Sequence, residues 1–404
     1  MATAWRWLSR ILLVLLLPVI VVAALWGYGR MTSPTASQRE AVAIMQVRPP
    51  LAAGENGFEL LRALPPRPAE GAPALPVCGN GTSCIDVIEA SPERSAAAIA
   101  AWRPWLEASA RALRAPAFRD LRTDTTVAGA LPAYQGMVQS RLLRAFDFSA
   151  GQTTAALEAL CEDTQGAVRR ATTPDILIDG MLGVAIVREN ALLIADMRRR
   201  APQDALPASC AALAVGPDPG VEGTLCPAMR GEWQWLTRVM GDLETQAPSN
   251  APAWALPLLH DPEWLLARTA ERYAPHCSAA AQDAARSDRP TAFAKVVPRW
   301  VDRIAYPVSV ILDSVAEPGY ASYAEQQLDY LAMRRLLGAF LQMEAMGVSL
   351  TAQQRFDALP ASQREGPRPL LLSDDGRSIA VPLRSARYVE SGSEMRLVLP
   401  GHGR

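Results

Sequence analysis

The chain has 404 residues, of which 50% are apolar and 20% are charged, and its formal net charge is -1. This much apolar sequence supplies a sizeable core, which excludes a wholly disordered chain, and the length allows two or three domains of about 150 residues. Lys295 is the only lysine among the 40 basic residues, and no glycine stands four to seven positions before it. The sequence therefore excludes a P-loop nucleotide hydrolase, whose phosphate-binding loop ends on a lysine at that spacing.

An apolar run near the N-terminus predicts a membrane anchor. Residues 11–26 carry no charge, and a helix over residues 8–28 is about 31 Å long, which matches a hydrocarbon core of about 30 Å. Arg6 and Arg10 precede the run, and the positive-inside rule places that end in the cytoplasm. We therefore predict a transmembrane anchor over residues 1–30 that contacts inner-membrane lipid through residues 8–28. A cleaved signal peptide is the alternative, although the run is slightly long for one.

Cysteines follow the anchor at six positions: Cys78, Cys84, Cys161, Cys210, Cys226 and Cys277. An even number in an exported chain is typical of disulfides, and we predict three of them. The first two flank a turn-rich stretch, residues 79–83, which can bring their Cα atoms within the roughly 4.4 to 6.8 Å that a disulfide requires. The other four allow three pairings, of which we favour Cys210 with Cys226 and Cys161 with Cys277.

Residues 31–90 are predicted to form a stalk that separates the body from the membrane. The stretch is rich in proline and glycine, with prolines at 49 and 50 and at 65, 66 and 68. Helices do not run through such positions, because proline lacks the amide donor and restricts the residue before it. We expect only two short helices, near residues 38–47 and 55–64, and the loop closed by the first disulfide.

Residues 91–365 are predicted to form a helical domain. Three segments combine an N-cap oxygen, proline at the first helical position and a carboxylate in the first turn, which together favour a helix start: Ser91-Pro92-Glu93, Thr173-Pro174-Asp175 and Asp261-Pro262-Glu263. After Thr173 the apolar residues recur at spacings of three and four, and they cover most of the helix circumference through Val187, which predicts a central helix. Further helices are predicted at residues 132–147, 152–170, 226–245, 290–312 and 320–346. The fold class is therefore mainly α, an irregular helical bundle.

Only the tail, residues 366–404, has strand patterns. Residues 370–372 and 378–383 flank Ser373-Asp374-Asp375-Gly376, whose Asp-Gly step is a hairpin signal, and a third segment covers residues 394–399. We expect a small antiparallel β element against the bundle.

The only cluster with mixed metal-ligand or catalytic residue types is formed by His260, Asp261, Glu263 and His276. Imidazole and carboxylate groups together suit zinc or acid–base chemistry. Asp261 and Glu263 already have structural roles, however, as a helix cap and a first-turn charge. A structural role for the cluster is therefore favoured over a catalytic one. His402, the third histidine, lies near the C-terminus.

Two other patterns carry weaker functional interpretations. Asp175 and Asp179 are four residues apart and could share a helix face, as an acid pair of the glycosidase kind or as partners of Arg188 and other arginines. Closely spaced tryptophans such as Trp102 and Trp105 pack in a core or line a groove for lipid or peptide.

Short catalytic and cofactor signatures are missing from the sequence. It contains no G-x-S-x-G, H-E-x-x-H, G-x-G-x-x-G or C-x-x-C, and we predict neither a cofactor nor a metal. The 40 basic residues less the three among the first 30 leave 37 beyond the anchor, against 41 acidic residues, a charge of -4. A mildly acidic body gives no electrostatic reason to bind nucleic acid.

Four short segments resemble a family of uncharacterised single-pass, periplasm-facing envelope proteins of Gram-negative bacteria: Gly54-Glu55-Asn56-Gly57-Phe58, Gln139-Ser140-Arg141-Leu142, Gly180-Met181-Leu182-Gly183-Val184-Ala185 and Gly231-Glu232-Trp233. The resemblance covers about two thirds of the chain. It implies a periplasmic location for the bulk of the chain, and no activity or functional residue.

The sequence thus predicts a membrane-anchored periplasmic protein that acts as a non-enzymatic interaction or assembly component of the cell envelope, with other envelope proteins as partners. One alternative is a periplasmic hydrolase that uses carboxylates or the His260 region. The other is a helical domain that binds lipid or peptide.

Overall fold

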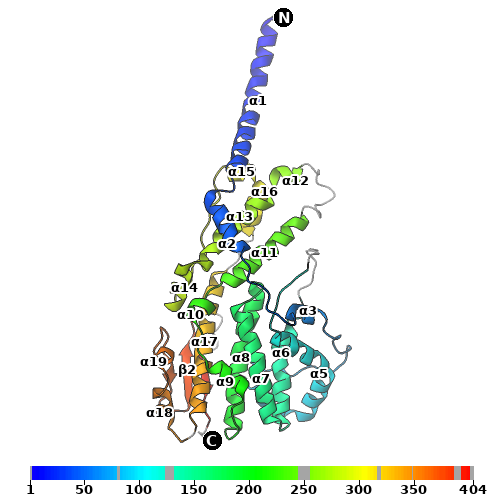
Figure 1. The fold of residues 1–404 in the computed structure, drawn as a ribbon. Coiled ribbons are helices and arrows are strands. Elements are labelled where there is room, and N and C mark those ends of the chain that lie inside the picture. The colour runs from blue at the N-terminus through cyan, green and yellow to red at the C-terminus, as the bar shows by residue number, and fades with distance from the viewer. Residues whose placement is uncertain are drawn as a thin grey trace.

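The computed structural model describes residues 2–79, 82–122, 132–243, 255–315, 320–347, 349–385 and 393–400. The chain is mainly helical and has a small three-stranded antiparallel sheet near its C-terminus, so the predicted fold class is confirmed. One long helix, α1 (Ala2–Met31), projects from one end of an elongated body (Figure 1).

Helix α1 is long and apolar enough to cross a membrane. Its segment Leu12–Met31 has a mean hydropathy of 2.4, and only 6% of that stretch is buried. A core helix of the same composition would be covered by neighbouring elements, whereas large side chains such as Leu13 and Val14 are 66% and 69% exposed here. The length, composition and exposure of this helix are those of a segment that can span a bilayer.

The helices within residues 31–90 pack against the body, so the predicted separate stalk is not found in the described part of this segment. Their helices are α2 (Ala36–Gln46), α3 (Gly57–Arg62) and α4 (Cys84–Ala90). Met45 of α2 is fully buried against α11 and α13, and Phe58 and Leu61 of α3 lie in the main core. Proline ends these helices early, as predicted, but each keeps an apolar face that the body covers.

The centre of the body is an antiparallel helical hairpin. The long helices are α5 (Pro92–Arg114), α6 (Gln135–Ser149), α7 (Thr153–Thr172), α8 (Leu177–Arg200) and α17 (Ala321–Ala345). Helices α7 and α8 make the most extensive contact, and α8 buries Val184, Val187 and Ile194. The predicted central helix is thereby confirmed. Gly183 permits the close approach, since a Cβ atom there would lie 2.5 Å from the Ala171 nitrogen.

The remaining helices of the described residues are mostly shorter: α9 (Ala208–Ala211), η1 (Ala212–Ala214), α10 (Pro219–Glu222), α11 (Cys226–Leu243), α12 (Ala255–Leu259), α13 (Pro262–Tyr273), η2 (Ala274–Cys277), α14 (Ala279–Arg286), α15 (Asp302–Ala305), α16 (Pro307–Val315), α18 (Ala352–Asp357) and α19 (Ala361–Arg364). The single helix predicted over residues 290–312 is wrong. Residues 290–299 have no regular structure, and α15 and α16 are separate. Pro290, Pro298 and Pro307 cause the break, because each removes a helical hydrogen bond.

The three similar helix-start signals have different outcomes. Asp261 caps α13, because its carboxylate accepts from the Trp264 N–H at 3.0 Å, and Ser91 precedes α5 without a side-chain cap bond. The prediction at Thr173 is wrong: Thr173 ends α7, and α8 begins only at Leu177. There the Leu177 N–H donates to the side chain of Glu232 from α11 at 2.7 Å, so a tertiary contact replaces the local cap.

The C-terminal sheet has the predicted antiparallel arrangement, with strand order β1 (Leu371–Leu372), β2 (Ser378–Pro382) and β3 (Glu394–Val398). Gly376 has φ +66° in the turn between β1 and β2, which explains the Asp-Gly step. Ile379 and Val381 of β2 join the main core beside α17. Residues 386–392 and 401–404 of the predicted tail lie outside the described residues, and His402 is among them.

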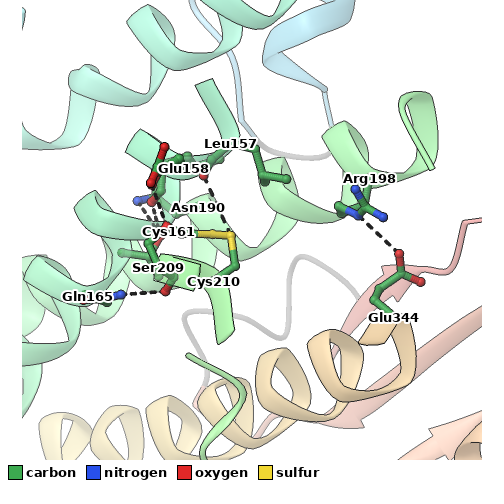
Figure 2. The surroundings of a disulfide bond; sticks show 11 residues. Leu157, Glu158, Cys161, Gln165, Asn190, Arg198, Ser209, Cys210 and Glu344 are labelled. Carbon is green, nitrogen blue, oxygen red and sulfur yellow. Dashed lines mark hydrogen bonds and ion pairs between the residues drawn. A yellow bond between two sulfur atoms is a disulfide. The ribbon is translucent and has the colours of Figure 1, made fainter. Parts of the chain in front are cut away.

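All six cysteines form disulfides, as predicted, and the Cys78–Cys84 pair is confirmed. The other two predicted pairs are wrong, because the bonds join Cys161 to Cys210 and Cys226 to Cys277. The α7–α8 hairpin reverses the chain, so that α9 returns beside α7. Figure 2 shows the disulfide that joins Cys161 to Cys210 there.

Side-chain hydrogen bonds support the contact between α7 and α9. The Gln165 amide donates to the Ser209 carbonyl at 2.6 Å, and the Ser209 hydroxyl donates to the Glu158 carbonyl at 3.2 Å. These bonds fix α9 at the height of Cys161, where the disulfide closes.

Candidate functional site

The structure does not bring the predicted histidine cluster together. Helix α13 separates His260, which precedes it, from His276, which follows it, and its 12 residues span about 18 Å. The His260 Nδ1 atom lies 2.8 Å from the Ser309 hydroxyl, and Asp261 is held by Arg30 at 3.3 Å in addition to its capping bond. Glu263 is exposed. No group of three or more His, Cys, Asp or Glu side chains within the described ranges is placed to hold a metal ion.

His276 is a core residue. It is 1% exposed, and its ring centroid lies 4.1 Å from that of Phe293. Burial lowers the pKa of His276 to about 4, because the charged imidazolium loses its hydration there. The imidazole is therefore neutral at physiological pH.

Asp175 and Asp179 do come together, in an arginine-rich cluster. Asp175 pairs with Arg48, and its Oδ2 accepts from the Asp120 N–H at 2.9 Å. Asp179 is fully buried beside Arg170, with its Oδ2 3.3 Å from the Asp175 N–H. The partners are thus Arg48 and Arg170, whereas Arg188 pairs with Glu189.

A cavity of about 230 Å³ adjoins this cluster, and four arginines line it with one carboxylate, that of Asp175: Arg48, Arg119, Arg170 and Arg230. Burial, together with the charges of Arg119 and Arg238, lowers the pKa of Arg48 to about 10. Burial raises the pKa of Asp179 to about 7, against the opposing effect of Arg170. With four arginines against one carboxylate, the cavity lining carries a surplus of positive charge.

Close packing of α11 holds this cluster in place. A Cβ atom on Gly231 would overlap the Asp175 carbonyl oxygen, so only glycine fits there. Its neighbour Glu232 holds the start of α8, and burial raises the pKa of Glu232. The roles of Arg48, Arg119 and Arg170 have no signal in the sequence, because arginine supplies all but one of the 40 basic residues and no spacing marks these three.

The end of α1 is clamped onto the body. The Trp26 indole donates to the Leu258 carbonyl at 3.0 Å, and the Arg30 guanidinium donates to the Pro257 carbonyl at 2.9 Å. The same guanidinium lies 4.9 Å from the centre of the Tyr306 ring, a cation–π contact worth about 0.5 to 1 kcal/mol. Several short-range contacts of this kind fix the direction in which α1 leaves the body.

Large apolar side chains are exposed around this clamp: Leu258 at 41%, Leu259 at 42%, Val297 at 62%, Trp300 at 64% and Ile311 at 61%. They belong to α12, to the segment before α15, and to α16, which lie where α1 emerges (Figure 1). The other tryptophans differ in exposure. Trp105 and Trp264 are buried, and the Trp102 indole donates to the Pro73 carbonyl at 3.0 Å, whereas Trp235 is 42% exposed.

Comparison with protein-family models, with curated proteins and with solved structures finds no match to this chain.

Proposed function

We propose that this chain is a single-pass membrane protein whose helical body is held against the outer face of the inner membrane as an interaction or assembly component of the cell envelope. Arg6 and Arg10 before the apolar run support a cytoplasmic N-terminus, and the three disulfides, a bond type that persists in oxidising compartments, support an extracytoplasmic body. Inner-membrane lipid contacts residues 8–28, and other envelope proteins bind the body.

The observation that carries the proposal is the clamp between α1 and the body. A flexible tether would let the body sample many orientations and distances. Here Gly29 of α1 packs so closely on α15 that a Cβ atom would lie 2.6 Å from the Ala305 Cβ. The body therefore presents one fixed face to the bilayer and its far end to partners in the envelope.

The exposed apolar side chains lie at the depth of the membrane interface. Trp26 ends the uncharged run and contacts Leu258, so Leu258 lies at the same depth. Trp300 stands between Arg299, whose guanidinium donates to the Ser33 hydroxyl at 2.6 Å, and Val301, which packs on Gly29. Tryptophan favours the interfacial region, where its ring meets hydrocarbon and its N–H meets water.

Fluorescence quenching in vesicles tests this arrangement. The full-length chain is reconstituted with lipids brominated near the headgroup, which quench tryptophans in contact with them. We expect Trp300→Phe to remove a quenched component, whereas Trp102→Phe, on α5 far from α1, removes an unquenched one. Equal loss of quenched signal from both variants, or recovery of the chain in the soluble fraction, would contradict the proposal.

A further inference from the structure

A second, larger cavity lies on the side of the body, away from the clamp between α1 and the body. Its volume is about 480 Å³, within the range of pockets that hold small molecules. It is open to solvent on one side and is lined by helices α10, α14 and α17 and by the segment from Pro360 to Arg368. Leu328, Leu331 and Ala332 of α17 form an apolar wall.

Three arginines line this cavity, and two of them already have acidic partners. Arg368 pairs with Asp329 and, at 2.7 Å, with Asp288. Asp288 also binds Arg384 at 2.8 Å, so both of its oxygens are engaged. Arg286, near the rim, pairs with the exposed Asp283 at 2.7 Å.

Arg335, the third, is the unmatched cation of the cavity. It makes no hydrogen bond or ion pair with any residue that the structure describes, and its Nε atom is buried without a partner. Burial and the charge of Arg368 lower the pKa of Arg335. The charge of Asp288 opposes this lowering only in part, so the half-buried guanidinium has lost hydration without gaining a hydrogen-bonded partner, a state that a bound anion would relieve.

Two glycines leave room for the guanidinium groups of Arg335 and Arg286. A Cβ atom on Gly366 would overlap the Arg335 Nη1 atom, and one on Gly220 would lie 2.5 Å from an Arg286 nitrogen. Gln363, also in the lining, has a buried Oε1 atom that accepts no hydrogen bond from the described residues. The cavity thus combines an unmatched cation, an unused acceptor and an apolar wall.

We propose that this cavity binds a small amphiphilic carboxylate, with its carboxylate on Arg335 and its hydrocarbon part against Leu328, Leu331 and Ala332. A planar guanidinium matches a carboxylate with two parallel hydrogen bonds. A single unmatched positive charge suits a monoanion, and the apolar wall excludes ligands that are polar throughout. The proposal does not depend on the clamp between α1 and the body or on the orientation of the chain in the membrane.

Titration calorimetry of the full-length chain in nanodiscs tests the site, with empty nanodiscs as the blank for uptake by lipid. Hexanoate, hexanol and acetate are the probes, because they separate the charge from the hydrocarbon. We expect saturable binding of hexanoate and at least about tenfold weaker binding of the other two. No saturable binding of hexanoate, or equally tight binding of hexanol, would overturn the proposal.

Two variants locate the binding. Arg335→Gln is expected to weaken hexanoate binding at least about tenfold, whereas Arg377→Gln, an exposed arginine beside the hairpin turn, leaves it unchanged. Gly366→Ala displaces the flexible end of Arg335 and no backbone, so it should weaken binding in a folded chain with intact disulfides. Hexanoate binding that survives in both Arg335→Gln and Gly366→Ala would show that the anion binds elsewhere.

Discussion

Replacing the buried Asp179 by asparagine should change how the stability of the protein depends on pH. The carboxyl group has 0% exposure, and its main charged neighbour is Arg170. Because burial outweighs the attraction of Arg170, the pKa of Asp179 is raised to about 7. Asparagine has nearly the same shape and no proton to lose.

The magnitude follows from the difference between the folded and unfolded chains. An unfolded aspartate has a pKa of about 3.9, so between pH 4 and 7 the unfolded chain releases a proton that the folded chain retains. A raised pKa of an acid therefore stabilises the fold fully at low pH, and this contribution is lost as pH rises to about 7. The loss amounts to about 4 kcal/mol. Above pH 7 both states are ionised, and the contribution no longer changes.

Unfolding free energies of the wild-type chain and of Asp179→Asn, measured in a neutral detergent from pH 4 to pH 8, test this reasoning. We expect the variant to gain about 4 kcal/mol relative to the wild type between the two limits. Other titrating groups are common to both proteins and cancel in the difference. A difference that is constant with pH would refute the assignment of a proton to Asp179.

Three further changes have defined outcomes. As pH falls from 6.5 to 4, the unfolded wild-type chain binds a proton at His276 that the folded chain does not, so the wild type should lose about 3 kcal/mol of stability. His276→Gln should not show this loss. Identical acid denaturation of both proteins would contradict the prediction. Replacing Cys161 and Cys210 together by alanine, which opens a loop of 49 residues, should cost about 4 kcal/mol in chemical unfolding, and an unchanged midpoint would count against this disulfide. Gly231→Ala should lower the free energy of unfolding, measured by thermal unfolding, by about 3 kcal/mol or more, because the new Cβ meets the Asp175 carbonyl. Gly241→Ala on the same helix, where a Cβ has nothing within 4 Å, should stabilise the protein by about 0.5 to 1 kcal/mol. Equal effects of the two substitutions would disprove the close contact at Gly231.

Features that depend on neighbouring residues were predictable from the sequence. The uncharged run of α1, the apolar spacing of α8 and the Asp-Gly turn each carry their signal within a short window, and each is found. The short Cys78–Cys84 loop belongs to the same class, since six residues limit where its ends can lie.

Features that depend on tertiary packing were not predictable. Helix α8 begins at Leu177 and not at the predicted position after Thr173, because Glu232 of α11 supplies the cap. Pairing of Cys161 with Cys210 requires knowledge that α7 and α8 form a hairpin. The same holds for Arg335: one arginine among many becomes a candidate ligand site only when packing deprives it of a partner.

The single lysine gives the most direct test of the orientation on which the proposed function rests. Lys295 is exposed on the body, and the only other amine is that of the N-terminus. A membrane-impermeant amine reagent applied to intact spheroplasts should label Lys295 and should leave Lys295→Arg unlabelled until the membrane is permeabilised. Labelling of Lys295 only after permeabilisation would place the body in the cytoplasm and contradict the proposal.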